Sequence, residues 1–322
     1  MDDRRSAALA GLAAYQSADR GPPRATPPVR YQHGRASLID YGGDGPPVIF
    51  VPSLINPPFI FDLASDRSLL RWLAAQGHHV LLLDWGTPTP EEHAADISAH
   101  VTDLLLPLAA KLGAPPVLIG YCLGGTIATA AASLMPVLGF AAIASPWHFT
   151  GFGERARARI AALWEAVEPG CRQMGLVPME VLQSAFWSLD PARTIAKFER
   201  FAELPPDSAA ARNFVALEDW ANGGAPLSYA AGAQMFDFFA RDLPGTGGWQ
   251  IGGRTIDPHA LNCPTIEFVS MTDRIVPSAS AAGFGARHDL QSGHVGMVVG
   301  SAAPELLWTP LADWIAGVTR SR

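Results

Sequence analysis

The stretch Gly120-Tyr121-Cys122-Leu123-Gly124-Gly125 decides the fold of this 322-residue chain. It follows the apolar run Val117-Leu118-Ile119 and precedes small residues, 126–132, that favour a helix. A strand, a sharp turn and a helix therefore follow one another, and the glycines let strand and helix approach closely. Because such a turn pushes its central side chain out above the sheet, we predict that Cys122 is a nucleophile. A buried cysteine in a glycine-rich core turn is the alternative.

Composition excludes several classes of protein. Hydrophobic residues make up 48% of the chain, charged residues 16%, and the net charge is −7, so neither a disordered chain nor a nucleic-acid binder is expected.

The chain has three cysteines, Cys122, Cys171 and Cys263, and their spacing is not that of a metal site. Such a set suits free thiols in a reducing cytoplasm. The uncharged stretch 114–147 is interrupted by prolines and the glycine turn, so no transmembrane segment is expected. The start of the chain does not resemble a signal peptide. We expect neither a metal nor a cofactor.

Strand and helix patterns alternate along most of the chain. A hairpin is predicted at 29–41, and apolar strands at 48–51, 80–83, 115–119, 140–144 and 264–270. Helical patterns at 68–76, 95–112 and 305–315 separate or follow them. The alternation predicts an α/β protein with a mostly parallel central sheet and helices on both faces.

The predicted organisation has four parts. Residues 1–28 form an N-terminal lead that packs loosely on the outside, with little function expected there. Residues 29–147 form the first part of the core, and 256–322 form its second part. Between them, 148–255 form an inserted, mainly helical cap, rich in aromatic residues and without a convincing strand.

Two further residues join Cys122 in a candidate catalytic triad. Asp273 comes just after the strand pattern 264–270, and His294 lies in a glycine loop before the last helix. The order nucleophile, acid, histidine is the one found in α/β-hydrolases, so we predict that fold and this triad. Taken singly, Asp273 could cap a surface turn, and His294 could be an ordinary loop histidine.

A loop rich in proline follows the first buried strand and is a candidate oxyanion-binding loop. In an α/β-hydrolase this loop supplies one backbone N–H and the residue after the nucleophile supplies the other. The candidates are the N–H groups of Leu54 or Ile55 and of Leu123. Asn56 is expected to pin this loop. Asn56 and Tyr121, which lies beside the nucleophile, are also the candidate substrate contacts.

Several of these stretches resemble one family, the catalytic subunits of polyhydroxyalkanoate synthases. The resemblance covers about residue 45 to the end, and the lack of a long N-terminal domain suggests the short kind that works with a second subunit. The matching segments are Val51-Pro52-Ser53-Leu54-Ile55-Asn56, Leu83-Asp84-Trp85-Gly86, Gly120-Tyr121-Cys122-Leu123-Gly124-Gly125-Thr126, Leu217-Glu218-Asp219-Trp220, Ile251-Gly252-Gly253-Arg254-Thr255-Ile256-Asp257 and Gly293-His294-Val295-Gly296.

The resemblance implies an acyltransferase that polymerises (R)-3-hydroxyacyl-CoA thioesters through Cys122, with Asp273 and His294 completing the triad. It also implies a second synthase subunit, a homodimer, and association with the surface of polymer granules in the cytoplasm. One position departs from the family, which usually carries a histidine after the catalytic aspartate, where this chain has Arg274. We expect the Arg274 charge to draw Asp273 partly away from His294 and to slow elongation without the partner.

Two other functions remain open from the sequence. The same triad would serve a thioesterase or an intracellular polyester depolymerase, and only the product distinguishes these from a polymerase. A non-catalytic granule or scaffold protein could also keep this fold, although it would not need to retain Cys122, Asp273 and His294.

Overall fold

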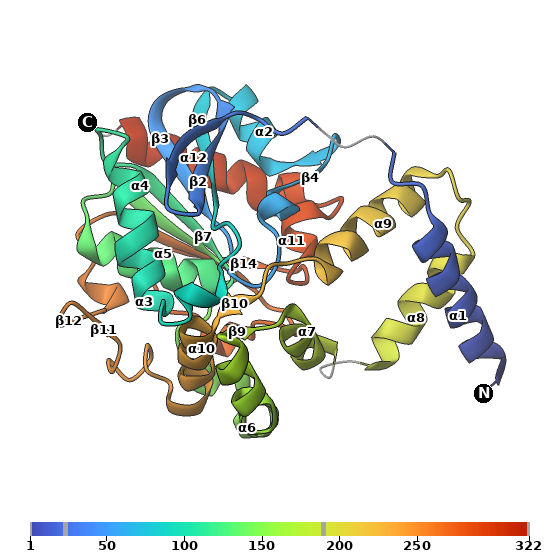
Figure 1. The fold of residues 1–322 in the computed structure, drawn as a ribbon. Helices are drawn as coiled ribbons and strands as arrows, with labels where there is room; N and C mark the ends of the chain where they lie inside the picture. The colour runs from blue at the N-terminus through green and yellow to red at the C-terminus, as the bar shows by residue number, and fades with distance from the viewer. Residues whose placement is uncertain (1, 22–24, 188–190, 321–322) are drawn as a thin grey trace.

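The computed structural model describes residues 2–21, 25–187 and 191–320, so residues 188–190 of the predicted cap lie outside the described residues. Its centre is an eight-stranded sheet in the order β1-β2-β6-β3-β7-β8-β13-β14 (Figure 1). The antiparallel strands β1 and β2 form the expected hairpin at one edge, and neighbouring strands from β6 to β14 run parallel. The predicted fold class is therefore confirmed. The strands of this sheet are β1 (Val29–His33), β2 (Ala36–Gly42), β3 (Asp44–Val51), β6 (His78–Asp84), β7 (Val117–Tyr121), β8 (Gly139–Ile143), β13 (Thr265–Ser270) and β14 (Arg287–Leu290).

Both faces of the sheet are buried, which explains why its central strands are apolar throughout. Successive side chains of β3 point to opposite faces, so Val48 and Phe50 enter one hydrophobic cluster while Ile49 and Val51 enter another. The first cluster includes side chains of α2, α11 and α12, and the second includes those of α3, α4 and α5 (Figure 1). The helices are α1 (Asp2–Ser17), α2 (Leu69–Ala75), α3 (Ile97–Ala99), α4 (Leu106–Ala110), α5 (Leu123–Leu134), α6 (Glu154–Met174), α7 (Met179–Trp187), α8 (Pro191–Ala202), α9 (Ala209–Asn222), α10 (Tyr229–Arg241), α11 (Gly296–Val299) and α12 (Thr309–Arg320).

The helix predicted at 95–112 is interrupted. A wide π-helical stretch, η3 (His100–Leu105), joins α3 to α4, and α4 carries Pro107 in its first turn. Proline has no N–H to donate to the preceding turn, so the regular α-helical hydrogen bonding is broken there. A π-helical stretch, with hydrogen bonds between residues five apart, can form at such a break. A second π-helical stretch, η7 (Pro304–Trp308), precedes α12.

The segment between β8 and β13 contains helices α6 to α10. It also contains two short strand pairs that the sequence pattern does not reveal, β9 (Leu176–Val177) with β10 (Leu227–Ser228) and β11 (Gln250–Ile251) with β12 (Arg254–Thr255). Two-residue strands are too short to show an alternating pattern. Many of the aromatic side chains pack on one another: Phe149 lies against Phe238 and Phe239.

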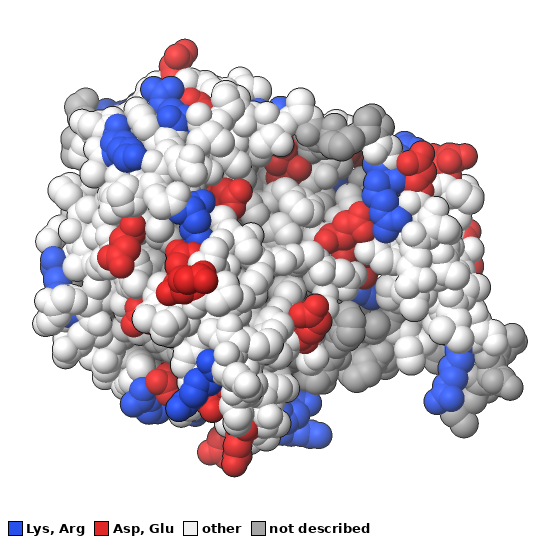
Figure 2. Space-filling model, viewed as in Figure 1, with Lys and Arg blue, Asp and Glu red and all other residues white. Residues whose placement is uncertain are grey.

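The N-terminal helix does not pack loosely, so that expectation was wrong. Helix α1 lies against α8 and, with α9, these helices form an arm that stands beside the body of the molecule (Figure 1). The space-filling view shows the surface hollowed between this arm and the body, with few charged residues over most of that face (Figure 2). Among the described residues, no helix combines the length and apolar character needed to cross a membrane.

Candidate active site

Cys122 lies in a strained turn between β7 and α5. Its backbone angles are φ 54° and ψ −134°, a conformation that residues with a side chain rarely adopt. The flanking glycines explain how the turn fits: a Cβ atom on Gly120 would lie 2.3 Å from the Gly125 Cα, and one on Gly124 would lie 2.2 Å from the Val51 carbonyl oxygen. The side chain of Cys122 is half-buried.

Asp273 and His294 come together at the ends of neighbouring strands. Asp273 follows β13 and His294 follows β14, and the His294 Nδ1 donates to the Asp273 Oδ2 over 2.6 Å. The other carboxylate oxygen, Oδ1, accepts the N–H groups of Ile275 at 2.7 Å and Val276 at 3.0 Å. The Asp273 side chain has no exposed surface and that of His294 is 6% exposed, so the pair is held in a fixed geometry out of water.

The charges around His294 favour its protonated form. Burial lowers the pKa of the imidazole, but the charges of Asp273 and Cys122, together with hydrogen bonds to both side chains, outweigh it and raise the pKa to about 10. The Cys122 side chain is thus the hydrogen-bonding partner of His294 on the side away from Asp273. The three predicted triad residues meet in one place, in the order that a nucleophile-base-acid unit requires.

Tyr121 does not face the space above Cys122, although we predicted a substrate contact. Its side chain is 2% exposed, stacks on the His294 ring with centroids 4.9 Å apart, and its hydroxyl donates to the His294 carbonyl oxygen. Burial and the charges of Cys122 and Asp273 raise its pKa well above the usual value, so the phenol stays neutral. The residue before the nucleophile therefore packs against the base.

The candidate oxyanion loop lies beside the turn. Leu54 and Ile55 are both 7% exposed, and the Ile55 N–H already donates to the Ser53 hydroxyl over 3.2 Å. This leaves the Leu54 N–H as the better candidate for one donor. Leu123, the first residue of α5, carries the other candidate N–H, because the first N–H groups of a helix have no acceptor within it.

Two tryptophans and one asparagine fix this loop, and no pattern in the sequence assigned the tryptophans a role here. Trp85 Nε1 donates to the Pro52 carbonyl oxygen at 3.0 Å, and Trp220 Nε1 donates to that of Pro57 at 2.9 Å. Asn56 donates through Nδ2 to the carbonyl oxygens of Trp220 and Ala221, each at 3.4 Å. The amide of Asn56 therefore ties the loop to α9, and the structure gives it a bracing position.

The other two thiols are poor nucleophiles. Cys171 is 1% exposed on α6, and burial together with the charge of Glu168 raises its pKa. Burial raises the pKa of Cys263 to about 11. The thiolate is the reactive form of cysteine, so the environment of both residues disfavours reaction. Within the described ranges no group of three or more His, Cys, Asp or Glu side chains is placed to hold a metal ion.

The fold and this site define a class of protein. Residues 48–307 match the model of the alpha/beta hydrolase family, and the chain belongs to that family. Solved structures agree in fold: the N-acyl homoserine lactonase AidH, bound to N-butanoyl homoserine, has a TM-score of 0.53 and 16% identity over 93% of this chain and 99% of its own. A monoacylglycerol lipase from Paleococcus ferrophilus has a TM-score of 0.53 and 14% identity over 88% of this chain and 99% of its own.

Several curated relatives share one name. The chain is 27% identical to the poly(3-hydroxyalkanoate) polymerase subunit PhaC of Haloferax mediterranei, over 89% of this chain and 63% of that protein. It is 26% identical to the subunit of the same name from Thiocystis violacea, over 84% of this chain and 80% of that protein. The chain thus spans about two thirds of the first relative's length.

Proposed function

We propose that this protein is an acyltransferase that joins (R)-3-hydroxyacyl groups from coenzyme A thioesters into polyhydroxyalkanoate, with Cys122 carrying the acyl chain. The observation that carries the proposal is the thiol at the strained turn, paired with His294 and Asp273, in a chain similar over most of its length to polymerase subunits. The name of those relatives supports the substrate class.

A thiol suits this reaction energetically. Acyl transfer from the sulfur of coenzyme A to that of Cys122 exchanges one thioester for another, so the acyl carbon keeps its reactivity. An ester on a serine would be more stable, and a hydroxyl of the next monomer would attack it with less driving force. The thiol at residue 122 therefore supports transfer to an alcohol.

In the first step His294 takes the thiol proton of Cys122, which gives a charged pair of thiolate and imidazolium. The thiolate attacks the carbonyl carbon, and the negative charge on oxygen is stabilised by the N–H groups of Leu123 and Leu54. The C–S bond to coenzyme A then breaks, and His294 gives its Nε2 proton to the leaving sulfur. The products are acylated Cys122, free coenzyme A and a neutral imidazole held by Asp273.

The second step benefits from a change in the base. Because the charge of Cys122 is one of the causes that raise the His294 pKa, acylation removes that cause and lowers the pKa. The neutral imidazole takes the proton of the incoming 3-hydroxyl, the resulting alkoxide attacks the thioester, and Cys122 leaves as thiolate. One ester bond forms, one thioester bond breaks, and the charged pair is restored.

The expected assembly follows from the same resemblance. Curated relatives are called subunits, which supports a second synthase subunit as a partner. We also propose a homodimer, a cytoplasmic location and binding at the surface of polymer granules.

The test is to incubate the purified protein with 3-hydroxybutyryl-CoA and to follow coenzyme A release and product size together. We expect polymer, loss of all turnover in Cys122→Ala, and full turnover in the matched variant Cys263→Ala. Release of coenzyme A with 3-hydroxybutyrate as the product would instead identify a thioesterase. Turnover in Cys122→Ala would refute the covalent mechanism.

A further inference from the structure

The arm formed by α1, α8 and α9 has a hydrophobic core of its own. Its cluster includes Phe201 and Val215, with Tyr15 and Phe214 packed against it. At the crossing of α1 and α8, Gly11 is buried, and a Cβ atom there would lie 1.9 Å from the Phe198 carbonyl oxygen. Helices approach this closely only where a glycine lies at the contact. Helix α1 is thus in close contact with α8 at this crossing.

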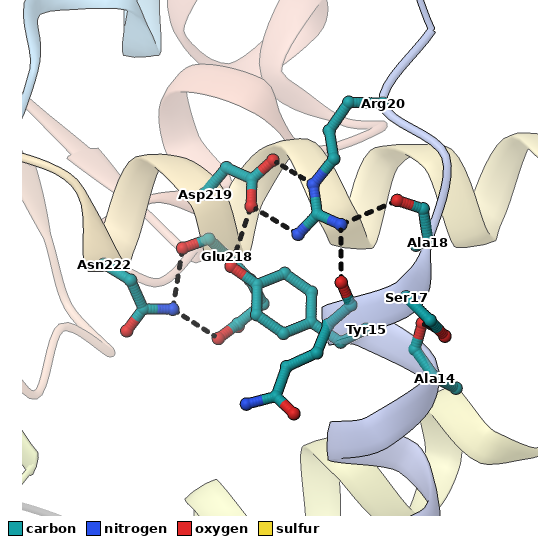
Figure 3. Close-up of polar contacts among 9 residues, drawn as sticks. Ala14, Tyr15, Ser17, Ala18, Arg20, Glu218, Asp219 and Asn222 are labelled. Carbon is teal, nitrogen blue, oxygen red and sulfur yellow. Dashed lines mark hydrogen bonds and ion pairs between the residues drawn. The ribbon is translucent and has the colours of Figure 1, made fainter.

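A polar clasp joins the end of α1 to α9 (Figure 3). Arg20 donates through Nε and Nη2 to the two carboxylate oxygens of Asp219, at 3.2 and 3.1 Å. The Tyr15 hydroxyl donates to the same carboxylate at 2.7 Å. Through Nη1, Arg20 also donates to the Ala18 carbonyl oxygen at 2.6 Å, just after the last turn of α1. The Asp219 carboxylate on α9 therefore binds both a side chain of α1 and the segment that follows α1.

The residue next to Asp219 reaches the candidate oxyanion loop. Trp220 donates from its indole to the Pro57 carbonyl oxygen, and its own carbonyl accepts from Asn56. The loop continues into η1 (Pro58–Phe61), where Phe61 lies edge-on to Tyr121 with ring centroids 5.6 Å apart. Tyr121 in turn stacks on His294. Hydrogen bonds, ring contacts and the backbone between them thus connect the clasp to both the loop and the base.

We propose that Asp219 is a positioning residue: by fixing α9 against the N-terminal helix, it sets the place of the oxyanion loop above Cys122. The inference rests on the proposed function, because it assumes that this loop stabilises an oxyanion. Exposed ion pairs contribute little stability by themselves, and the Asp219 and Arg20 side chains are 33% and 41% exposed. The clasp is therefore expected to act on geometry more than on the stability of the fold.

The test separates thiolate chemistry from oxyanion stabilisation. Alkylation of Cys122 by iodoacetamide needs the thiolate but no oxyanion donor, whereas the burst of p-nitrophenol from p-nitrophenyl acetate needs both. In Asp219→Ala we expect acylation to slow about tenfold, which is less than the loss caused by removing a whole oxyanion donor. Alkylation should stay within about twofold of the wild-type rate. Asp219→Asn should lie between, because it keeps acceptors for Tyr15 but loses the charge that binds Arg20.

Two further variants complete the design. Asp237 and Arg241 form an exposed ion pair within α10, away from the clasp. Asp237→Ala breaks this pair and should change neither the acylation rate nor the alkylation rate. Gly11→Ala forces α1 away from Phe198 without touching the clasp residues, and should reproduce the slow acylation.

Three results would overturn the proposal. Acylation in Asp219→Ala and Gly11→Ala could stay within twofold of the wild-type rate. Acylation and alkylation could fall together, which would indicate a general loss of structure. Asp237→Ala could slow acylation as much as Asp219→Ala. Because p-nitrophenyl acetate carries no coenzyme A, the result stands even if the protein fails to use 3-hydroxyacyl-CoA, so the two proposals fail separately.

Discussion

Acidification should destabilise this protein through one buried histidine outside the active site. His100 is 2% exposed, its Nδ1 donates to the Asp96 carbonyl oxygen at 2.6 Å, and its Nε2 lies 2.6 Å from the Arg35 Nη2. A guanidinium can only donate, so this imidazole nitrogen must accept and the ring is neutral. Burial, with the positive charge of Arg35, lowers the pKa of His100 to about 4.

The size of the effect follows from the two pKa values. Above pH 6.5 the ring is neutral in both the folded and the unfolded chain, and the stability is fully present. Below pH 6.5 only the unfolded chain binds a proton, so the free energy of unfolding falls with pH until the folded pKa near 4 is passed. At pH 4.5 the loss from this group is about 2.5 kcal/mol, at 1.36 kcal/mol per pKa unit.

The assay is urea unfolding followed by tryptophan fluorescence at pH 7.5 and 4.5. Carboxylates also titrate in this range, so the informative quantity is the difference in pH dependence between the wild type and His100→Gln. We expect the wild type to lose about 2 to 3 kcal/mol more than the variant. His33→Gln, on the exposed strand β1, is the matched control and should keep the wild-type dependence. Equal losses in the wild type and His100→Gln would refute the reasoning.

Three further predictions concern the active site. Limited iodoacetamide treatment should label Cys122 before Cys171, and peptide mapping that finds the reverse would contradict the assignment. His294→Ala should lower turnover by roughly 10³-fold or more, since the base is lost, and a loss under tenfold would place the base elsewhere. Gly125→Ala should abolish acylation, because a Cβ atom there would lie 1.7 Å from the Ser145 hydroxyl oxygen. Adding Ser145→Gly should restore part of the rate, and a double variant no better than the single one would count against a steric cause.

The central sheet could be predicted because its physics is local. Apolar runs buried on both faces, glycines around Cys122, and polar residues just after strands are visible without a structure. By contrast, β14 carries the sequence Arg287-His288-Asp289-Leu290, in which only Leu290 is buried. A short edge strand with polar side chains has no hydrophobic pattern, so the strand that precedes His294 was missed.

The supports of the site were harder to see than its reactive groups. Triad residues are recognisable by type and order, whereas Tyr121 next to the nucleophile could point to either side of the sheet. Its place under His294 follows from the pleat of β7 and from packing against Phe61. The clasp from Arg20 to Asp219 joins residues 199 apart in the chain, and no periodic pattern connects them.

The contacts of Asp273 contradict one expectation about the neighbouring residue, Arg274. The expectation that its charge draws Asp273 away from His294 was wrong, because both carboxylate oxygens are held, by two backbone N–H groups and by the imidazole. The Asp273 side chain is buried while Arg274 is exposed on the surface of the same loop. Replacing Arg274 should therefore leave the triad intact.

We expect the side chain at position 274, which is exposed, to act on a partner subunit or on the polymer. We expect Arg274→His to acylate within about twofold of the wild-type rate, because His294 and two backbone N–H groups hold both carboxylate oxygens of Asp273. Arg287→His, on the neighbouring strand β14, is the control for changing a surface charge nearby. A tenfold change in the p-nitrophenol burst of Arg274→His alone would contradict this placement. A change confined to chain elongation would instead assign the position to the partner or the polymer, since acylation needs neither.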